Sequence, residues 1–411
     1  MSDFYDALET RTKNERDAAH LSALQTQLQH AKSNAAAYSE ILEDFDITKL
    51  ETVADLSSYP VTRKSELIEK QAAKRPFGGL TAYSKGQLKY VFSSPGPIYE
   101  PQTQREDYWR FSRALFAAGF RRGELVHNCF SYHLTPAGAM ADSGCHALGC
   151  SVIPAGVGQT ELQVQTIHDL KPTAYIGTPS FLRIILEKAD ELGVDVSSIN
   201  KALVSGEAFP PSTREFFLER GIQAAQCYAT ADLGLIAYES TADSGLILDE
   251  GVHAEIVRPG TGDVVADGEV GEVVVTTFNP DYPLIRFATG DLSAIMTEES
   301  PCGRTNRRIK GWMGRADQTA KVRGMFIHPE QVDQVVKRHP EIERARLVVE
   351  WVNESDQMTL HCETTDSSEA LKLAIANSIR ELCKVRGDVA LVAPASLAND
   401  GVVIADQRQY D

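Results

Sequence analysis

Residues 283–292, PLIRFATGDL, and residues 302–324, CGRTNRRIKGWMGRADQTAKVRG, dominate the interpretation of this chain. The first segment is apolar and strand-like and ends in a Thr-Gly-Asp turn, which exposes the carboxylate of Asp291 at the mouth of a cleft. A carboxylate there can accept hydrogen bonds from a vicinal diol such as a ribose. The second segment gathers cations in an acidic protein, which indicates a place where an anion binds. Together the two segments suggest a nucleotide; the alternative is a β-turn aspartate followed by a solvated basic loop. The cations are Arg304, Arg307, Arg308, Lys310, Arg315, Lys321 and Arg323.

Length and charge exclude several classes of function. At 411 residues the chain can bury large cores and form two or more domains. The net charge is 41 − 57 = −16, which argues against a nucleic-acid partner and against an anionic membrane. No run approaches the roughly 20 apolar residues that cross a bilayer, and residues 1–16 carry no apolar signal core. The seven cysteines are scattered without a CxxC pair, so we expect reduced thiols and a cytoplasmic protein.

The middle of the chain alternates short apolar strands with amphipathic helices. Strands are predicted at 124–130, 150–154, 173–176 and 201–204, and the one at 150–154 is expected to be buried. Helices are predicted at 109–118, 136–148, 161–170 and 180–192. This alternation favours a parallel, doubly wound α/β layer, and 177–180 follows one strand where such sheets place ligands. Ser212-Thr213-Arg214-Glu215 reads as a capping box that opens a helix ending at Gly221.

The two ends of the chain have different patterns. Residues 1–75 read as helical, with one long helix over 3–37. Residues 246–277 read as β, in a small antiparallel sheet or barrel within a β-rich part at about 245–300. Residues 317–411 predict a helix from His328, strands at 345–351, 358–363 and 389–392, and a helix over 368–385. The expected fold class is α/β: a large N-terminal domain of doubly wound α/β layers plus a small β subdomain (1–316), followed by a small mobile α+β C-terminal domain (317–411).

The ordered matches PLIRFATGDL, CGRT, RRI and GRAD resemble the adenylate-forming superfamily (acyl-CoA synthetases and AMP-dependent ligases), and within it the phenylacetate–CoA ligase family. Pro60, Thr62, Lys64 and Leu67 resemble that family's P-x-T-x-K-x-x-L segment, although an ordinary capped helix start explains them equally well. The resemblance implies an AMP-forming acyl- or aryl-CoA ligase that activates a carboxylate, in expectation an aromatic one. ATP and Mg²⁺ would yield an acyl-adenylate, and the acyl group would pass to CoA.

The resemblance also implies roles for individual residues. Asp291 would hold the ribose, Tyr228 would stack on the adenine, and Gly206 and Glu207 would border the base. Arg315 would contact the phosphate, Asp232 would hold Mg²⁺ in place of the family's glutamate, and Asp317 would be the hinge of the domain swing. Without the resemblance, Tyr228 is a core aromatic residue and His133 a satisfied structural histidine. The acyl pocket would be formed by Phe130, Tyr132, His133 and Ala208.

Three phosphate-facing places depart from the family's pattern. The residues of the phosphate loop would be Ser93, Ser94 and Gly96. Pro97 to Glu100 replace the Gly-Lys with which the family's loop ends, so a cation is lost and an anion is added. The alternative is a turn stiffened by proline. Ala231 loses a hydroxyl near the α-phosphate. Val402 stands where the family carries a C-terminal lysine, and losing such a transition-state cation typically costs a few kcal/mol, roughly two to three powers of ten in rate.

Two alternatives therefore stay open. The chain could be a catalytically weakened relative that binds nucleotide or acyl-adenylate, or an adenylating enzyme with an acceptor other than CoA. The expected partners are a small carboxylate, ATP or AMP, and CoA, with a homodimer left open. The Cys/His metal knot of several relatives is not expected here, since its places read Ser240, Ile247 and Ser300 beside Cys302.

Overall fold

The computed structural model describes residues 3–95, 97–240, 244–316, 318–322, 325–352 and 355–408. The chain forms two compact units, which are described separately. The first comprises Met1–Ala254, Val275–Thr289 and Met296–Trp312, and the second comprises Glu255–Val274, Gly290–Ile295 and Met313–Asp411. The domain boundary between 316 and 317 stays a prediction.

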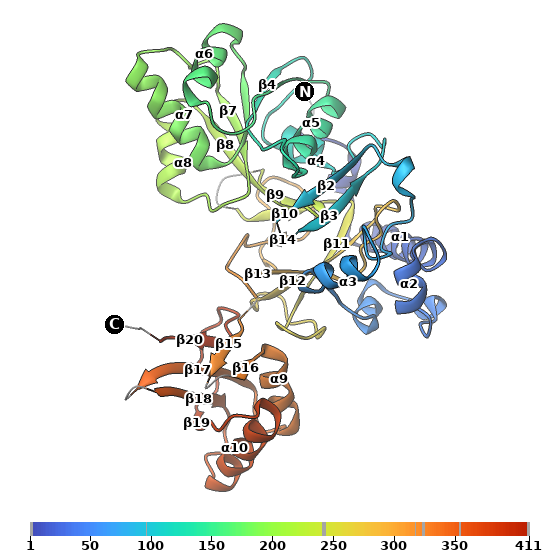
Figure 1. Ribbon diagram of the computed structural model, residues 1–411, viewed down its shortest axis with the longest axis vertical. Helices are drawn as coiled ribbons and strands as arrows, with labels where there is room; N and C mark the ends of the chain where they lie inside the picture. Colours follow the sequence, from blue (N-terminus) through green and yellow to red (C-terminus); the bar gives the residue numbers. More distant parts are fainter. Residues whose placement is uncertain are drawn as a thin grey trace. The chain divides into compact units, whose positions relative to one another are not determined.

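An eight-stranded sheet organises the first unit (Figure 1). Its order is β14-β10-β9-β8-β7-β6-β4-β5, in which β5, β4, β6, β7 and β8 run parallel and β9, β10 and β14 antiparallel. The strands are β4 (Leu125–Asn128), β5 (Ser151–Pro154), β6 (Ala174–Gly177), β7 (Lys201–Val204), β8 (Gln223–Thr230), β9 (Gly234–Tyr238), β10 (Leu246–Leu248) and β14 (Arg308–Ile309). Helices follow the parallel strands: α5 (Ala137–Leu148), α6 (Thr160–Leu170), α7 (Pro179–Leu192) and α8 (Pro211–Leu218). The predicted α/β layer is confirmed.

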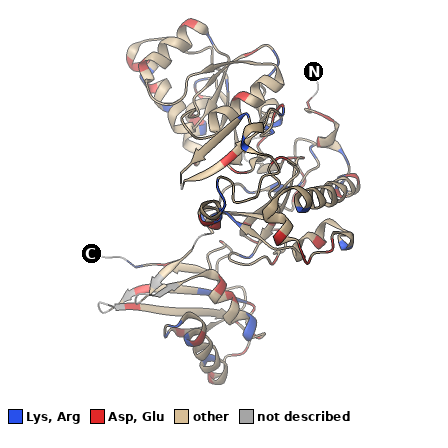
Figure 2. Cartoon of the chain, turned by 45° about the vertical axis from the view of Figure 1, so that its right-hand side comes forward, with Lys and Arg blue, Asp and Glu red and all other residues tan. Residues whose placement is uncertain are grey.

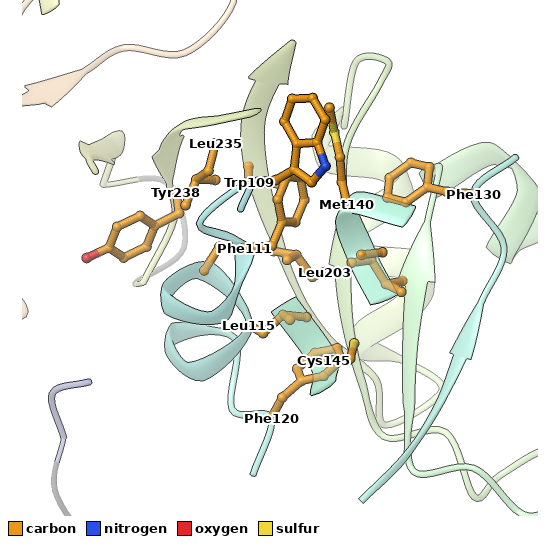
Figure 3. Close-up of a cluster of buried hydrophobic side chains, with 14 of the residues drawn as sticks. Trp109, Phe111, Leu115, Phe120, Phe130, Met140, Cys145, Leu203, Leu235 and Tyr238 are labelled. Atoms are coloured by element: carbon orange, nitrogen blue, oxygen red, sulfur yellow. The ribbon is translucent and has the colours of Figure 1, made fainter. Parts of the chain in front are cut away.

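A hydrophobic cluster fixes helix α4 (Phe111–Ala117) and α5 against this sheet (Figure 3). Trp109, Leu115 and Phe120 are each at most 1% exposed. Burying side chains of this size contributes roughly 1.5–3 kcal/mol each. The two helices cross closely because Gly144 has no side chain: a Cβ there would lie 2.5 Å from Cβ of Phe111.

The chain also contains helical segments, a hairpin and a small sheet. The sheet has the order β1-β13-β12-β11, with β1 parallel to β13. Its strands are β1 (Thr62–Arg63), β11 (Val252–Val257), β12 (Gly271–Thr277) and β13 (Phe287–Ser293). The hairpin joins β2 (Tyr90–Ser94) to β3 (Ile98–Gln102). The helices are η1 (Ala7–Thr10), α1 (Lys13–Asn34), α2 (Ala36–Ile41), η2 (Ile47–Lys49), η3 (Val53–Ser58), η4 (Lys64–Glu66), α3 (Leu67–Ala73) and η5 (Lys85–Gln87).

The second unit has the predicted α+β character. A four-stranded sheet in the order β19-β18-β17-β20 is accompanied by two helices and a β-hairpin. The strands and helices are β15 (Ala320–Val322), β16 (Met325–Ile327), α9 (Pro329–Arg338), β17 (Arg344–Val352), β18 (Ser355–Glu363), α10 (Glu369–Cys383), β19 (Asp388–Val392) and β20 (Ile404–Asp406). Val335, Ile375 and Val349 are fully buried between the helices and this sheet.

Three local predictions are wrong. The helix expected over 3–37 is interrupted, because the side chain of Thr12 caps a helix that begins at Lys13. Ser212 does not cap α8, since Pro211 already occupies the first turn and Pro210 is the cap. The strand expected to be buried at 150–154 is β5, and it lies at the sheet edge with Ser151 exposed. Within the described residues, no helix is both long and apolar enough to span a membrane.

Candidate active site

The carboxyl ends of β4, β6 and β7 bring together Phe130, Thr178 and Gly206. Gly206 has a φ of +87°, and a Cβ there would lie 3.7 Å from Cγ2 of Thr178 and 4.0 Å from Cε1 of Phe130. Gly206 therefore keeps the backbone close to both side chains, at the edge where open α/β sheets bind ligands. The carboxylate of Glu207 binds the start of a neighbouring helix: its Oε1 accepts a hydrogen bond of 2.6 Å from the backbone N of Ser180 in α7.

Tyr228 is joined to strand β13, which contains Thr289, Gly290 and Asp291, so the Thr-Gly-Asp turn expected from the sequence is wrong and these residues are part of a strand. It lies on β8, half-buried, and its hydroxyl donates to Oγ1 of Thr289 at 3.1 Å. Thr289 lies on β13, two residues before Asp291. The hydrogen bond fixes the position of the tyrosine ring, which is a requirement for stacking on a base.

Asp291 and Arg315 form a pair in the second unit. Nη1 of Arg315 donates to Oδ1 of Asp291 at 2.8 Å, with 55% of the arginine side chain and 14% of the aspartate side chain exposed. The backbone supports the pair, since Asp291 and Arg315 face each other in an antiparallel bridge. Gly290 is required between them: its φ is +77°, and a Cβ would lie 2.6 Å from the Arg315 guanidinium.

Two other arginines of the basic segment, Arg304 and Arg308, have structural roles. Arg304 is 6% exposed and lies 3.1 Å from Oε1 of Glu9. Arg308 is 4% exposed and donates to the backbone carbonyls of Glu298 and Glu299. The prediction that the whole segment faces an anion is therefore wrong for these two residues. The carboxylate of Glu9 pairs with Arg304, and backbone carbonyls bind Arg308. Figure 2 shows acidic and basic positions interspersed along the helices and strands.

Asp232, Lys64, Glu100 and Ser94 form a cluster of four polar side chains, of which Lys64 is partly exposed. Asp232 is 3% exposed as a residue, and its Oδ2 lies 2.5 Å from Nζ of Lys64. Its Oδ1 is buried without a hydrogen-bond partner among the described residues. Glu100 is fully buried, and the Ser94 hydroxyl donates to its Oε1. Burial, with a smaller effect of the Asp232 charge, raises the pKa of Glu100 to about 7.

This protonation changes the interpretation of the predicted phosphate loop. The sequence indicated that Glu100 adds an anion there, but Glu100 is buried on β3, and its raised pKa leaves part of the population neutral at pH 7. Ser94 is committed to Glu100, and the backbone N of Ser93 donates to the carbonyl of Leu134 at 2.9 Å. The segment is a hairpin turn between β2 and β3. Gly96 lies outside the described residues, and so does Asp317.

The residues predicted for the acyl pocket differ in their surroundings. Phe130 is 9% exposed at the margin of the core cluster beside Met140 (Figure 3). The hydroxyl of Tyr132 lies 2.7 Å from both Oδ1 of Asp142 and Nδ2 of Asn128. Its polar group is thus held by the protein, a network that the sequence analysis missed because Asp142 lies a full helical turn inside α5.

His133 and Ala208 are exposed. Their place in an acyl pocket stays a prediction, and so does the alternative that His133 is a satisfied structural histidine. Within the described part of the chain, no three His, Cys, Asp or Glu side chains are grouped to hold a metal.

The loop around Val402 is fixed by backbone contacts in the second unit. The carbonyl of Val402 accepts from Nε of Arg346 at 2.9 Å, and its N–H donates to Oδ1 of Asp400 at 3.0 Å. Val402 also lines a cavity of about 480 Å³, with Arg258, Glu269 and Arg344 among the other lining residues. None of the predicted site residues lines this cavity.

Comparison with known proteins gives matches along most of the chain. The family model described as AMP-binding enzyme matches residues 128–279, and the one described as AMP-binding enzyme C-terminal domain matches residues 324–408. A phenylacetate-coenzyme A ligase of Pseudomonas putida is 30% identical over 80% of this chain and 77% of its own. One of Aromatoleum evansii is 28% identical over 95% of this chain and 93% of its own. A solved 2-hydroxyisobutyryl-CoA ligase, open and in complex with 2-HIB-AMP and CoA, has a TM-score of 0.73 at 26% identity over 97% of this chain and 92% of that chain.

Proposed function

The chain belongs to the phenylacetate–coenzyme A ligase family of AMP-binding enzymes, and we propose that it is an AMP-forming carboxylate–CoA ligase. It would join a carboxylic acid, of an aromatic class, to the AMP part of ATP and then pass the acyl group to the thiol of CoA. The observation that carries the proposal is the ion pair between Arg315 and Asp291, because it places a cation beside the carboxylate expected to hold a ribose.

The roles of the nucleotide residues follow from their chemistry. The carboxylate of Asp291 would accept hydrogen bonds from the ribose hydroxyls, and the exposed guanidinium of Arg315 would contact a phosphate. Tyr228, held by Thr289, would stack on the adenine, with Gly206 and Glu207 at the border of the base. Phe130, Tyr132, His133 and Ala208 would line the acyl group.

Magnesium fits one position in this arrangement. The Oδ1 atom of Asp232 is buried and lacks a hydrogen-bond partner among the described residues, as expected of an oxygen that receives a cation. A single carboxylate agrees with the way Mg²⁺ is usually held in nucleotide sites, by one or two carboxylates, substrate phosphates and water. When bound, the ion would neutralise phosphate charge. The zinc knot of relatives is not proposed.

The proposal extends to domain movement and location. Residues 317–411 would form the mobile domain that swings about Asp317 between adenylation and transfer to CoA, with 1–316 as the N-terminal domain. We place the protein in the cytoplasm, and a homodimer remains a prediction.

Release of pyrophosphate from ATP and Mg²⁺ tests the proposal, with a panel of aromatic and aliphatic acids and with or without CoA. Acid-dependent release, stimulated by CoA, is the expected result. An acceptor other than CoA would give acid-dependent release without this stimulation. AMP binding by calorimetry without any pyrophosphate release would instead favour a weakened relative that only binds nucleotide, an alternative for which Val402 is the supporting observation.

A further inference from the structure

We propose that Lys64 is the cation that this chain presents to the α-phosphate of ATP during adenylation, and that Asp232 holds it there. The inference rests on the proposed function and deepens it. It assigns a catalytic role to a lysine that the sequence placed in a segment similar to the family's P-x-T-x-K-x-x-L pattern, or in an ordinary capped helix start, without giving it a role.

The geometry brings Lys64 to the place where two phosphate-facing segments meet. Lys64 opens η4 directly after β1, and its ammonium lies 2.5 Å from Oδ2 of Asp232 in the loop between β8 and β9. Glu100, beside Asp232 and Lys64, receives the hydroxyl of Ser94 from the predicted phosphate loop. Residues from three distant parts of the chain therefore converge on one lysine, inside the first unit.

Exposure and charge fit a lysine that serves a ligand. The Lys64 side chain is 29% exposed, whereas that of Asp232 is fully buried, so the ammonium lies between a buried carboxylate and solvent. Lysine has three N–H donors, and the contact with Asp232 uses one of them.

The chemistry requires such a cation. An oxygen of the substrate carboxylate attacks the α-phosphorus and forms a new P–O bond, while the bond from that phosphorus to the bridging oxygen breaks and pyrophosphate leaves with the electron pair. No proton and no redox partner is consumed. Charge accumulates on the α-phosphate oxygens, and a fixed cation there stabilises the transition state. Val402 carries no such charge.

Calorimetry with AMP and adenosine tests the inference without turnover and without metal, in EDTA. The variants are K64M, which keeps the length of the side chain without its charge, K64R, and the double variant K64M/D232N, which leaves no unpaired buried carboxylate. The matched control is K70M, six residues further on, where Lys70 pairs with Glu66 at 2.9 Å and both side chains are at least 36% exposed.

The expected result is a loss of about tenfold or more in AMP affinity for K64M and for K64M/D232N, with adenosine affinity unchanged and K64R close to wild type. K70M should bind both ligands as wild type does. With phenylacetate as probe, ATP–pyrophosphate exchange in K64M should fall by about 10²–10³-fold, while transfer from preformed phenylacetyl-adenylate to CoA changes far less. An AMP preference over adenosine that survives in the double variant would overturn the role of Lys64. Failure of the wild type to bind AMP at all would overturn the proposed function itself.

Discussion

Arg315 donates to Asp291 at 2.8 Å, and Asp291 follows Gly290, whose φ of +77° favours glycine. More than half of the arginine side chain is exposed, so the ion pair contributes little to folding, about 0.2–1 kcal/mol. We expect Arg315→Ala to leave the melting temperature nearly unchanged. Acid-dependent pyrophosphate release should nevertheless fall by about 10²-fold or more, because a cation near developing phosphate charge is lost.

The control for this variant is Arg338→Ala. Arg338 forms a comparable exposed pair with Glu381 at 2.9 Å, on the surface of the second unit. Thermal melting and pyrophosphate release are measured for both variants. Equal activity losses in the two would show that Arg315 has no special role, and a large loss of stability in Arg315→Ala alone would show that its function is structural.

Glu100 gives a pH dependence of stability with a definite sign. Its folded pKa is raised from 4.5 to about 7, so the folded state holds the proton more tightly than the unfolded state. This contribution is fully present below pH 4.5 and is lost as the pH rises through 7. We expect Glu100→Gln to raise the free energy of unfolding at pH 8 by up to about 3 kcal/mol and to change little at pH 4.5.

Urea unfolding of Glu100→Gln and wild type at pH 4.5, 6 and 8 measures this difference. Glutamine keeps a carbonyl oxygen that can accept the Ser94 hydroxyl, so the variant tests the charge alone. A difference between the two proteins that does not grow with pH would contradict the raised pKa.

His20 and His253 predict the opposite slope on the acid side. Burial, assisted by Arg11 and Arg16, lowers the pKa of His20 to about 4, and burial beside His20 lowers that of His253 to about 3. Both rings are neutral in the folded protein and charge more readily when unfolded. Their contribution is present above pH 6.5 and is lost as the pH falls toward 4. In His20→Asn the free energy of unfolding should fall less steeply with decreasing pH, by the equivalent of about one bound proton. The measurement is the free energy of unfolding of both proteins at pH 4.5, 5.5 and 6.5. An unchanged slope would contradict the prediction.

Local pattern predicted much of the fold. Strand β7 has the bounds expected from its sequence, Lys201–Val204, and α7 ends at Gly193 with φ of +66°, because apolar periodicity and a C-cap glycine are signals within a few residues. The start of α8 was missed for an equally local reason. Pro211 occupies the first turn of the helix, where proline is favoured, so the helix begins before Ser212 and this serine cannot be its N-cap.

The sequence named candidate site residues one by one, but it did not predict which of them would pair. Asp291 and Arg315 were both expected, yet only the fold shows that they bond to each other. Lys64 and Asp232 are 168 positions apart, and no periodicity links two such positions. The burial of Glu100 was not predicted either. Which face of a hairpin becomes buried depends on residues that are distant in the sequence.

Val402→Lys, made in wild type and in K64M, measures whether Lys64 has taken over the role of the absent lysine. Backbone hydrogen bonds to Arg346 and Asp400 hold the loop, so the substitution changes the side chain alone. Two cations that stabilise the same charge are partly redundant. We therefore expect Val402→Lys to raise the rate of ATP–pyrophosphate exchange by less than about tenfold in wild type and by about 100-fold or more in K64M. Val402→Met is the neutral control of similar length. Equal gains in the two backgrounds would mean that the two lysines act independently.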